Sequence, residues 1–323
     1  MVLIISAPDD NSTQDVIDWL IFHEKEYFVV YKRDLIESMD IKLCETGVEF
    51  LLEIDDKIIN SKEITSFWYR RGHLSYKPLF DPKQYQYGSK FASYLSAEWQ
   101  AVSEGLYTIL ESKRSIGSFS KEFYNNKINN LMLAQRCALE IPKTWITSEK
   151  KTLDLIRKED NVITKSINND IYYNIDNSVE FANFGPMVIE DTHLERMRAK
   201  FHHSLIQKHI DKSYELRIFI VHDKIYAAAI FSQNNPNTQL DSRVTDFDKP
   251  VRMTPYTLPH SIQTKLLKFM TLSGQNSASI DMIVTPDKEY IFLEANPVGQ
   301  FGYLSFYCNY HIEHEMAEFL ISN

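Results

Sequence analysis

The sequence contains few glycines and few cysteines, with 9 Gly and 3 Cys among its 323 residues. Residues 8–11, which follow the first apolar stretch, include no glycine and therefore form neither a dinucleotide-binding turn nor a P-loop. Cys44, Cys137 and Cys308 are odd in number and far apart, without the paired spacing of a disulfide framework or a zinc site. This cysteine usage fits a reducing cytosol, and we expect a cytoplasmic protein.

Long hydrophobic runs and an excess of positive charge are also missing. Residues 1–10 lack a basic region, and their apolar run is too short for a signal peptide or a membrane span. A formal net charge of -9 and a pI near 5.6 disfavour binding to a phosphate backbone. We therefore expect neither a membrane segment nor a nucleic-acid partner. The 44% hydrophobic and 13% aromatic content instead predicts a large core, shared by about two or three domains.

The N-terminal third predicts an α/β arrangement. A strand over residues 2–7, a helix after it and a strand over residues 27–31 form a βαβ unit with a structural role. A further strand over 65–69 ends at Arg70 and Arg71, whose guanidinium groups would suit a carboxylate or phosphate. Solvated surface charges are the alternative. A long amphipathic helix follows over residues 90–110, and its predicted buried side comprises Phe91, Tyr94, Leu95, Trp99, Val102 and Leu106.

The last part of the chain predicts a metal-binding hairpin within residues 279–302. Two strands, joined by a turn-rich link, carry Asp281 on the first and Glu294 and Asn296 on the second. Because side chains alternate along a strand, Glu294 and Asn296 share a face, and Asp281 can lie opposite them. Such oxygen ligands suit Mg²⁺ bound to a nucleotide, whereas an ordinary hairpin with polar outward positions is the alternative.

Three basic side chains stand at the ends or faces of elements in the middle of the chain. Lys127 precedes a helix, and Lys165 ends a strand, so both could reach the phosphates of one nucleotide, although charge alone does not decide this. In the predicted hairpin over 215–231, Arg217 shares a face with Glu215 and could lean over a bound anion. An exposed ion pair of little energetic weight is the alternative.

In order along the chain, these residues resemble the ATP-grasp superfamily. Within it, several segments resemble the graspetide (microviridin-type) macrocyclases, especially the grasp-with-spasm peptide maturases, and the resemblance covers nearly the whole chain. The segments are Trp68-Tyr69-Arg70-Arg71, Glu215-Leu216-Arg217, Phe231-Ser232-Gln233, Ile280-Asp281-Met282-Ile283 and Leu293-Glu294-Ala295-Asn296-Pro297-Val298-Gly299-Gln300-Phe301.

The resemblance implies an α/β (α+β) ATP-grasp fold with three domains. These are a Rossmann-like pre-ATP-grasp N-terminal domain over 1–118, a central ATP-grasp domain over 119–210 and a C-terminal ATP-grasp domain over 211–323. ATP would lie between the last two. The glycine-rich phosphate loop of the wider superfamily is missing after Lys165, and a hairpin over 171–184 occupies its place. This hairpin and a helix expected over 191–203 are the candidate leader-peptide contacts.

The resemblance also implies a role for each site residue. Phosphates and adenine would be bound by Lys127, Lys165, Gln207, Lys208 and Ile210, the last two through the backbone. Magnesium would be bound by Asp281, Glu294 and Asn296. The transferred phosphoryl group and the acidic acceptor would meet Arg217 and Arg243, and Arg70 and Arg71 would bind substrate.

The implied function is an ATP-dependent peptide ligase. It would activate Glu or Asp side chains of a ribosomally made precursor peptide, leader plus core, as acyl phosphates. Rings would then close with Thr or Ser as esters, which we favour over amides with Lys. A homodimer is left open. An ATP-grasp ligase that adds amino acids or glutamate to a protein terminus, or builds a dipeptide, is the nearest alternative, and a non-catalytic nucleotide- or peptide-binding module is a further one.

Overall fold

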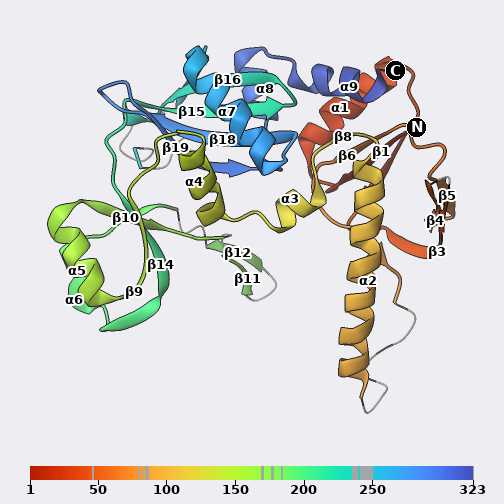
Figure 1. Ribbon diagram of the computed structural model, residues 1–323, viewed down its shortest axis with the longest axis horizontal. Coiled ribbons are helices and arrows are strands. Elements are labelled where there is room, and N and C mark those ends of the chain that lie inside the picture. The colour runs from red at the N-terminus through yellow and green to blue at the C-terminus, as the bar shows by residue number, and fades with distance from the viewer. Residues whose placement is uncertain are drawn as a thin grey trace. The chain divides into compact units, whose positions relative to one another are not determined.

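The computed structural model describes residues 1–45, 47–78, 81, 83, 87–168, 171–175, 178–182, 185–234, 239–240 and 250–322. It contains two compact units, each of mixed α/β structure, so the predicted fold class is confirmed (Figure 1). Unit 1 comprises residues 1–124, 274–278 and 297–323, and unit 2 comprises residues 125–273 and 279–296. No helix among the described residues is both long and apolar enough to cross a bilayer.

Unit 1 is built on a parallel sheet with strand order β2-β1-β6-β8. Its strands are β1 (Val2–Ser6), β2 (Tyr27–Tyr31), β6 (Ser66–Tyr69) and β8 (Arg114–Ile116). Every residue of β1 is buried, as expected for a parallel strand covered on both faces. Helix α1 (Asn11–Phe22) connects β1 to β2, so the predicted βαβ unit is confirmed.

The other elements of unit 1 form a second sheet and cover the first. The second sheet has the order β5-β4-β3-β7 and contains β3 (Leu35–Cys44), β4 (Gly47–Ile54), β5 (Lys57–Asn60) and β7 (Ser75–Tyr76). The helices are α2 (Gly88–Glu111), α3 (Phe119–Phe123), α8 (Gly302–Cys308) and α9 (Ile312–Ile321). One core cluster joins Leu3 and Phe67 of the parallel sheet to Leu106 and Leu110 of α2.

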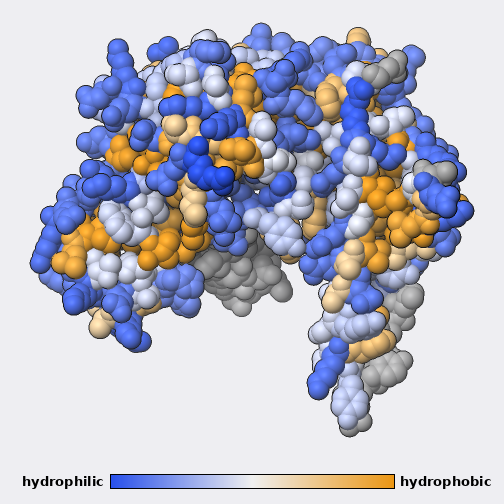
Figure 2. Space-filling view, in the orientation of Figure 1, coloured by the Kyte–Doolittle hydropathy of each residue, from blue (hydrophilic) through white to orange (hydrophobic). Residues whose placement is uncertain are grey.

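Helix α2 differs from its prediction. Leu106, Tyr107 and Leu110 in its C-terminal half are buried, but Phe91, Tyr94 and Leu95 are 51%, 56% and 39% exposed. The 24 residues of α2 span about 36 Å at the helical rise, far more than the short strands against which its C-terminal half packs. The N-terminal half therefore extends beyond the sheet of unit 1, and hydrophobic and hydrophilic residues both occur along it (Figures 1 and 2).

Unit 2 contains two larger sheets. The first has the order β13-β10-β14-β9, with β9 (Thr144–Glu149), β10 (Val162–Lys165), β13 (Met187–Val188) and β14 (Lys200–Lys208). Helices α5 (Lys150–Glu159) and α6 (Asp191–Arg196) pack with this sheet, whereas α4 (Lys127–Arg136) contacts the other large sheet of the unit. Strands β11 (Ile171–Ile175) and β12 (Ser178–Ala182) pair as the predicted hairpin, while Asp176 and Asn177 of its turn lie outside the described residues. The helix expected over 191–203 is wrong beyond Arg196, because Met197 is extended and leads into β14.

The second sheet of unit 2 has the order β17-β16-β15-β18-β19. Its strands are β15 (Tyr214–Val221), β16 (Lys224–Phe231), β17 (Arg252–Pro255), β18 (Ser277–Val284) and β19 (Tyr290–Asn296), and α7 (His260–Ser273) precedes β18. Both predicted hairpins, β15 with β16 and β18 with β19, are antiparallel pairs. Strand β18 lies beside β15, which places the two hairpins in one sheet.

The C-terminal segment does not stay with this sheet. Residues 297–323, which we expected in the last domain, fold with unit 1, where α9 contacts α1, β6 and β8. Ile312, Met316 and Leu320 of α9 are buried there, because α9 covers part of the parallel sheet. The division of the chain into three domains at residues 118 and 210 stays a prediction.

Candidate nucleotide and metal site

The two acids of the predicted metal site face each other across β18 and β19. Asp281 is the register partner of Glu294, and Asn296 is the partner of Ser279. A β-bulge follows Asp281 and locally alters the alternation of side chains. Directly opposite residues in an antiparallel pair have Cβ atoms about 4.5–5.5 Å apart, so the two carboxylates can meet one ion.

Arg217 of β15 binds the first of these acids. Its Nη1 lies 2.8 Å from Oδ1 and 3.0 Å from Oδ2 of Asp281. The side chains are 14% and 28% exposed, so this is a partly buried ion pair rather than a pair of solvated surface charges. The contact follows from the strand order, since β15 and β18 are neighbours in the sheet.

The electrostatics of Asp281 favour a bound cation. Burial raises the pKa of Asp281, and the nearby carboxylates of Glu294 and Glu215 raise it further, while Arg217 acts in the opposite direction. Negative charge at this position is therefore incompletely compensated by the protein. A hard divalent cation with carboxylate and amide ligands would compensate it, so the residues present fit Mg²⁺.

Lys127 joins this group from the start of α4. Asn126 caps the helix by accepting hydrogen bonds from the amides of Ile128 and Asn129, which fixes Lys127 in its first turn. Its Nζ lies 3.3 Å from Oε2 of Glu294 and donates to the carbonyl of Ser166 at 3.0 Å. Lys165 is the last residue of β10, directly before Ser166. Lys127 therefore reaches both Glu294, a predicted metal ligand, and the residue that follows β10.

Two asparagines that the sequence patterns did not indicate hold the strand between the predicted metal ligands Glu294 and Asn296. Asn130 is buried, and its Nδ2 donates to the carbonyl of Ala295 at 3.2 Å and to Oδ1 of Asn125 at 2.9 Å. Asn125 also donates to the Ala295 carbonyl, at 3.4 Å. Since Ala295 separates Glu294 from Asn296, these bonds fix the backbone from which both ligands project. The sequence signal that could have indicated this role is the side-chain amide of Asn130 on the side of α4 that also carries Leu131 and Ala134.

We expect Asn130→Ala to weaken the apparent affinity for Mg²⁺ by about tenfold, because changes to residues that orient metal ligands typically cost 10- to 100-fold. The concentration of Mg²⁺ that half-saturates ATP turnover measures this effect. Asn129→Ala is the matched control, since Asn129 is the exposed neighbour of Asn130 on the same helix. Equal Mg²⁺ requirements in the two variants would contradict the positioning role.

The residues expected near adenine lie at the end of β14. Gln207 is 1% exposed, and its Nε2 donates to Oγ1 of Thr144 at 3.0 Å. The Nζ of Lys208 pairs with Oδ1 of Asp160 at 2.9 Å, and Ile210 follows just beyond the strand. The side chains of Gln207 and Lys208 are thus engaged within the protein, and the backbone amide of Lys208 donates to the carbonyl of Lys143 at 2.9 Å. The adenine contacts stay a prediction.

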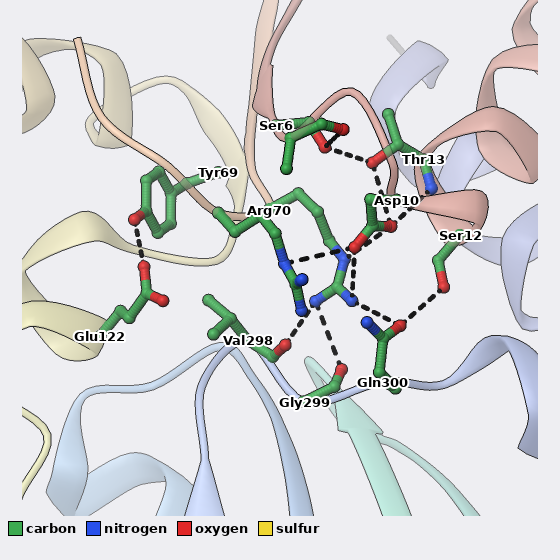
Figure 3. A network of polar contacts seen from close by, with 12 residues as sticks. Ser6, Asp10, Ser12, Thr13, Tyr69, Arg70, Glu122, Val298, Gly299 and Gln300 are labelled. Carbon is green, nitrogen blue, oxygen red and sulfur yellow. Dashed lines mark hydrogen bonds and ion pairs between the residues drawn. The ribbon is translucent and has the colours of Figure 1, made fainter. Parts of the chain in front are cut away.

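Arg70 lies in a buried polar network of unit 1 (Figure 3). Its Nε and Nη2 contact the two oxygens of Asp10 at 3.2 and 3.0 Å, and Nη2 donates to Oε1 of Gln300 at 2.8 Å. Nη1 donates to the carbonyl of Val298 at 2.5 Å. Arg71, 33% exposed, lies 3.3 Å from the same aspartate. The geometry favours a structural role for Arg70, which ties residues 298–300 to the start of α1, while substrate binding by either arginine stays a prediction.

Arg243 and Glu215 are the remaining residues of interest for the predicted site. Arg243 lies outside the described residues. Glu215, to which we assigned no role, accepts hydrogen bonds from Nζ of Lys212 at 2.6 Å and from Oγ of Ser232 at 2.9 Å. Because Glu215 and Arg217 are two residues apart on β15, their shared face could have indicated that Glu215 borders the same cluster.

Comparisons with known proteins give structural neighbours over the whole chain. No family model matches it, and no curated protein does. Macrocyclase MdnC from Microcystis aeruginosa, solved with its precursor peptide MdnA, is 29% identical with a TM-score of 0.79, and the match covers 99% of both chains. A RiPP-associated ATP-grasp ligase from Chryseobacterium gregarium, solved with ADP and a leader and core peptide, is 23% identical with a TM-score of 0.79, covering 99% of this chain and 94% of that one.

A further neighbour, macrocyclase MdnB from Microcystis aeruginosa, is 22% identical with a TM-score of 0.73, covering 100% of this chain and 99% of the other. The ATP-grasp ligase PsnB, 16% identical, was solved with a minimal precursor, Mg and ADP. These likenesses confirm the fold that the ordered residues predicted. The chain therefore has the fold of these ATP-grasp ligases and macrocyclases, several of which were solved with precursor peptides, and an ATP-dependent ligase is supported.

Proposed function

We propose that the chain is an ATP-dependent macrocyclase of a ribosomally made precursor peptide, leader plus core. The observation that carries the proposal is the convergence of Asp281, Glu294, Arg217 and Lys127 within unit 2, on a fold shared with macrocyclases. MdnC, which is similar at 29% identity over the full chain and was solved with its precursor peptide, supports a peptide substrate. Cytoplasmic action, where ATP and Mg²⁺ are available, belongs to the same proposal.

Different site residues would bind Mg²⁺ and the phosphates of ATP. Asp281, Glu294 and Asn296 would hold Mg²⁺, which supplies positive charge to the phosphate oxygens when bound. Lys127 and Lys165 would contact the phosphates. In this structure Lys127 instead pairs with Glu294 at 3.3 Å, so its ammonium group is already held next to the metal ligands.

Arg217 would act on the group that is transferred. Its fork is oriented by Asp281, and a guanidinium can bind both an acidic side chain and a phosphoryl group through two points. Positive charge held in place before the reaction stabilises the charge that develops during phosphoryl transfer. We assign Arg243 to the same task.

The reaction needs activation because a side-chain carboxylate is a poor electrophile. Transfer of the γ-phosphoryl group of ATP to a Glu or Asp carboxylate of the peptide gives ADP and an acyl phosphate. A hydroxyl of Thr or Ser in the same peptide then attacks the acyl carbon, loses its proton and displaces phosphate. Holding both groups of one peptide in the site makes ring closure effectively unimolecular. The bond formed would be an ester, with an amide from Lys as the second option.

An amino-acid or glutamate ligase acting on a protein terminus, or a dipeptide ligase, would use the same nucleotide residues and differ only in its acceptor. A non-catalytic binding module would hold nucleotide without turnover. ADP release in the presence of each candidate acceptor separates the three. Our proposal predicts release that depends on a precursor peptide encoded next to the enzyme, with Thr-rich and Glu- or Asp-rich segments, and little release with free amino acids. A homodimer stays a prediction that light scattering can test.

A further inference from the structure

Unit 1 contains a group of side chains of metal-ligating types, and none of them is among the residues that we assign to ATP and peptide. His23 directly follows α1, and His314 and Glu318 lie one turn apart on α9. The three side chains are partly buried, and each offers a ligand atom within 4.8 Å of the other two. The ligase reaction uses none of them.

The backbone holds these side chains in place from two helices. The amide of His23 donates to the carbonyl of Trp19 at 3.0 Å, so the histidine closes the last turn of α1. Residues four apart on a helix are neighbours, which places His314 beside Glu318. Because α1 packs against α9, the imidazole from one helix meets an imidazole and a carboxylate from the other.

The distances suit zinc after small side-chain rotations. Oε1 of Glu318 lies 2.9 Å from Nε2 of His23 and 3.7 Å from Nε2 of His314. In a tetrahedral zinc site with bonds near 2.0–2.1 Å, neighbouring ligand atoms are about 3.3 Å apart, between these two values. The His23 Nε2 is buried and makes no well-aligned hydrogen bond within the described part of the chain, although it lies within ion-pair distance of Glu318. When His23 is neutral, its lone pair can serve a metal.

We propose that His23, His314 and Glu318 bind one Zn²⁺ ion, with water as the fourth ligand, and that this ion ties the end of α1 to α9. Imidazole nitrogen favours Zn²⁺ and related transition metals over Mg²⁺, which prefers oxygen ligands. The site is therefore chemically distinct from the acid and amide set of unit 2. The alternative is an ion pair between His23 and Glu318 with no bound metal.

Trp19 provides a reporter for the ion. The centroid of its ring lies 4.4 Å from that of His314 and 6.3 Å from that of His23. An ion that reorients both imidazoles changes the surroundings of the indole. We therefore expect its fluorescence to respond to zinc, and Trp19→Phe to lose this response while keeping the heat of binding.

The test is a titration of the full chain with zinc chloride in the presence of excess Mg²⁺. Calorimetry and tryptophan fluorescence monitor the binding. We expect one Zn²⁺ per chain, and binding at least about tenfold weaker in Glu318→Gln and in His314→Asn, since each loses a direct ligand. Zinc should also raise the melting temperature of the unaltered protein more than that of Glu318→Gln.

His203→Asn is the matched control, because it removes an exposed imidazole of β14 that adjoins another histidine but no proposed ligand. It should bind zinc as the unaltered protein does. Glu318 is 46% exposed, so its glutamine variant should fold normally. Zinc binding of equal strength in Glu318→Gln, or no binding by the unaltered chain, would overturn the proposal in favour of the metal-free pair.

Discussion

Glu294→Gln should remove most of the peptide-dependent ATP hydrolysis while leaving the fold intact. Glutamine keeps the shape of the side chain but not the negative charge that a divalent cation requires of its ligand. We expect turnover to fall more than about a hundredfold, because even residues that only orient a metal ligand contribute about 10- to 100-fold. The fold should persist, since Glu294 is 25% exposed and its Lys127 partner can still contact Ser166.

The measurement is the initial rate of ADP release with precursor peptide and saturating Mg²⁺, together with a thermal melt of each variant. Glu289→Gln is the matched control, because Glu289 is an exposed acid in the turn of the same hairpin. It should behave like the unaltered enzyme. Normal turnover by Glu294→Gln would remove Glu294 from the metal site.

Arg217→Lys should damage turnover far more than nucleotide affinity. Lysine keeps the positive charge but lacks the planar fork that spans a phosphoryl oxygen and a carboxylate together. Its single ammonium also cannot reproduce the contact of Nη1 with both oxygens of Asp281 while presenting a second nitrogen to the substrate. An interaction made mainly in the transition state lowers kcat and kcat/KM together, so we expect both to fall by about a hundredfold.

In the same variant, the dissociation constant of ADP, measured by calorimetry, should change by less than about threefold. This is expected if Arg217 acts on the transferred group rather than on the bound nucleotide. Arg252→Lys is the control, since Arg252 is an exposed arginine of β17 in the same sheet. Equal turnover in Arg217→Lys and the control would place Arg217 outside the reaction.

The sequence predicted the hairpins of unit 2 because strand periodicity and turn residues are local signals. From them follow the shared face of Glu294 and Asn296 and the position of Asp281 opposite Glu294. The pairing of Arg217 with Asp281 did not follow, because it depends on β15 lying beside β18, and strands that are not consecutive in sequence become neighbours only through the whole fold. The Asn130 bond to Ala295 was missed for the same reason, since α4 and β19 are distant in the chain.

Local sequence patterns did not predict how far a helix extends beyond the sheet on which it packs, or in which unit a helix packs. Helix α2 has the predicted apolar side, yet Phe91 and Tyr94 remain exposed because the helix is longer than the sheet it packs on. The resemblance placed residues 297–323 in the last domain, whereas α9 packs in unit 1. Arg70 at a strand end was predicted to bind substrate; Asp10 and the carbonyl of Val298 contact its guanidinium group, and substrate binding stays a prediction.

The central claim is that the enzyme closes rings within a peptide, and mass spectrometry of the product tests it most directly. Enzyme, ATP, Mg²⁺ and the full precursor are incubated, and the waters lost from the peptide are counted before and after mild alkali. An ester lacks amide resonance, so we predict a loss of one water per ring that alkali restores. Water loss that survives alkali would contradict the ester and leave macrocyclisation standing through an amide. If no peptide encoded next to the enzyme lost water, the proposal that the enzyme is a macrocyclase would be contradicted.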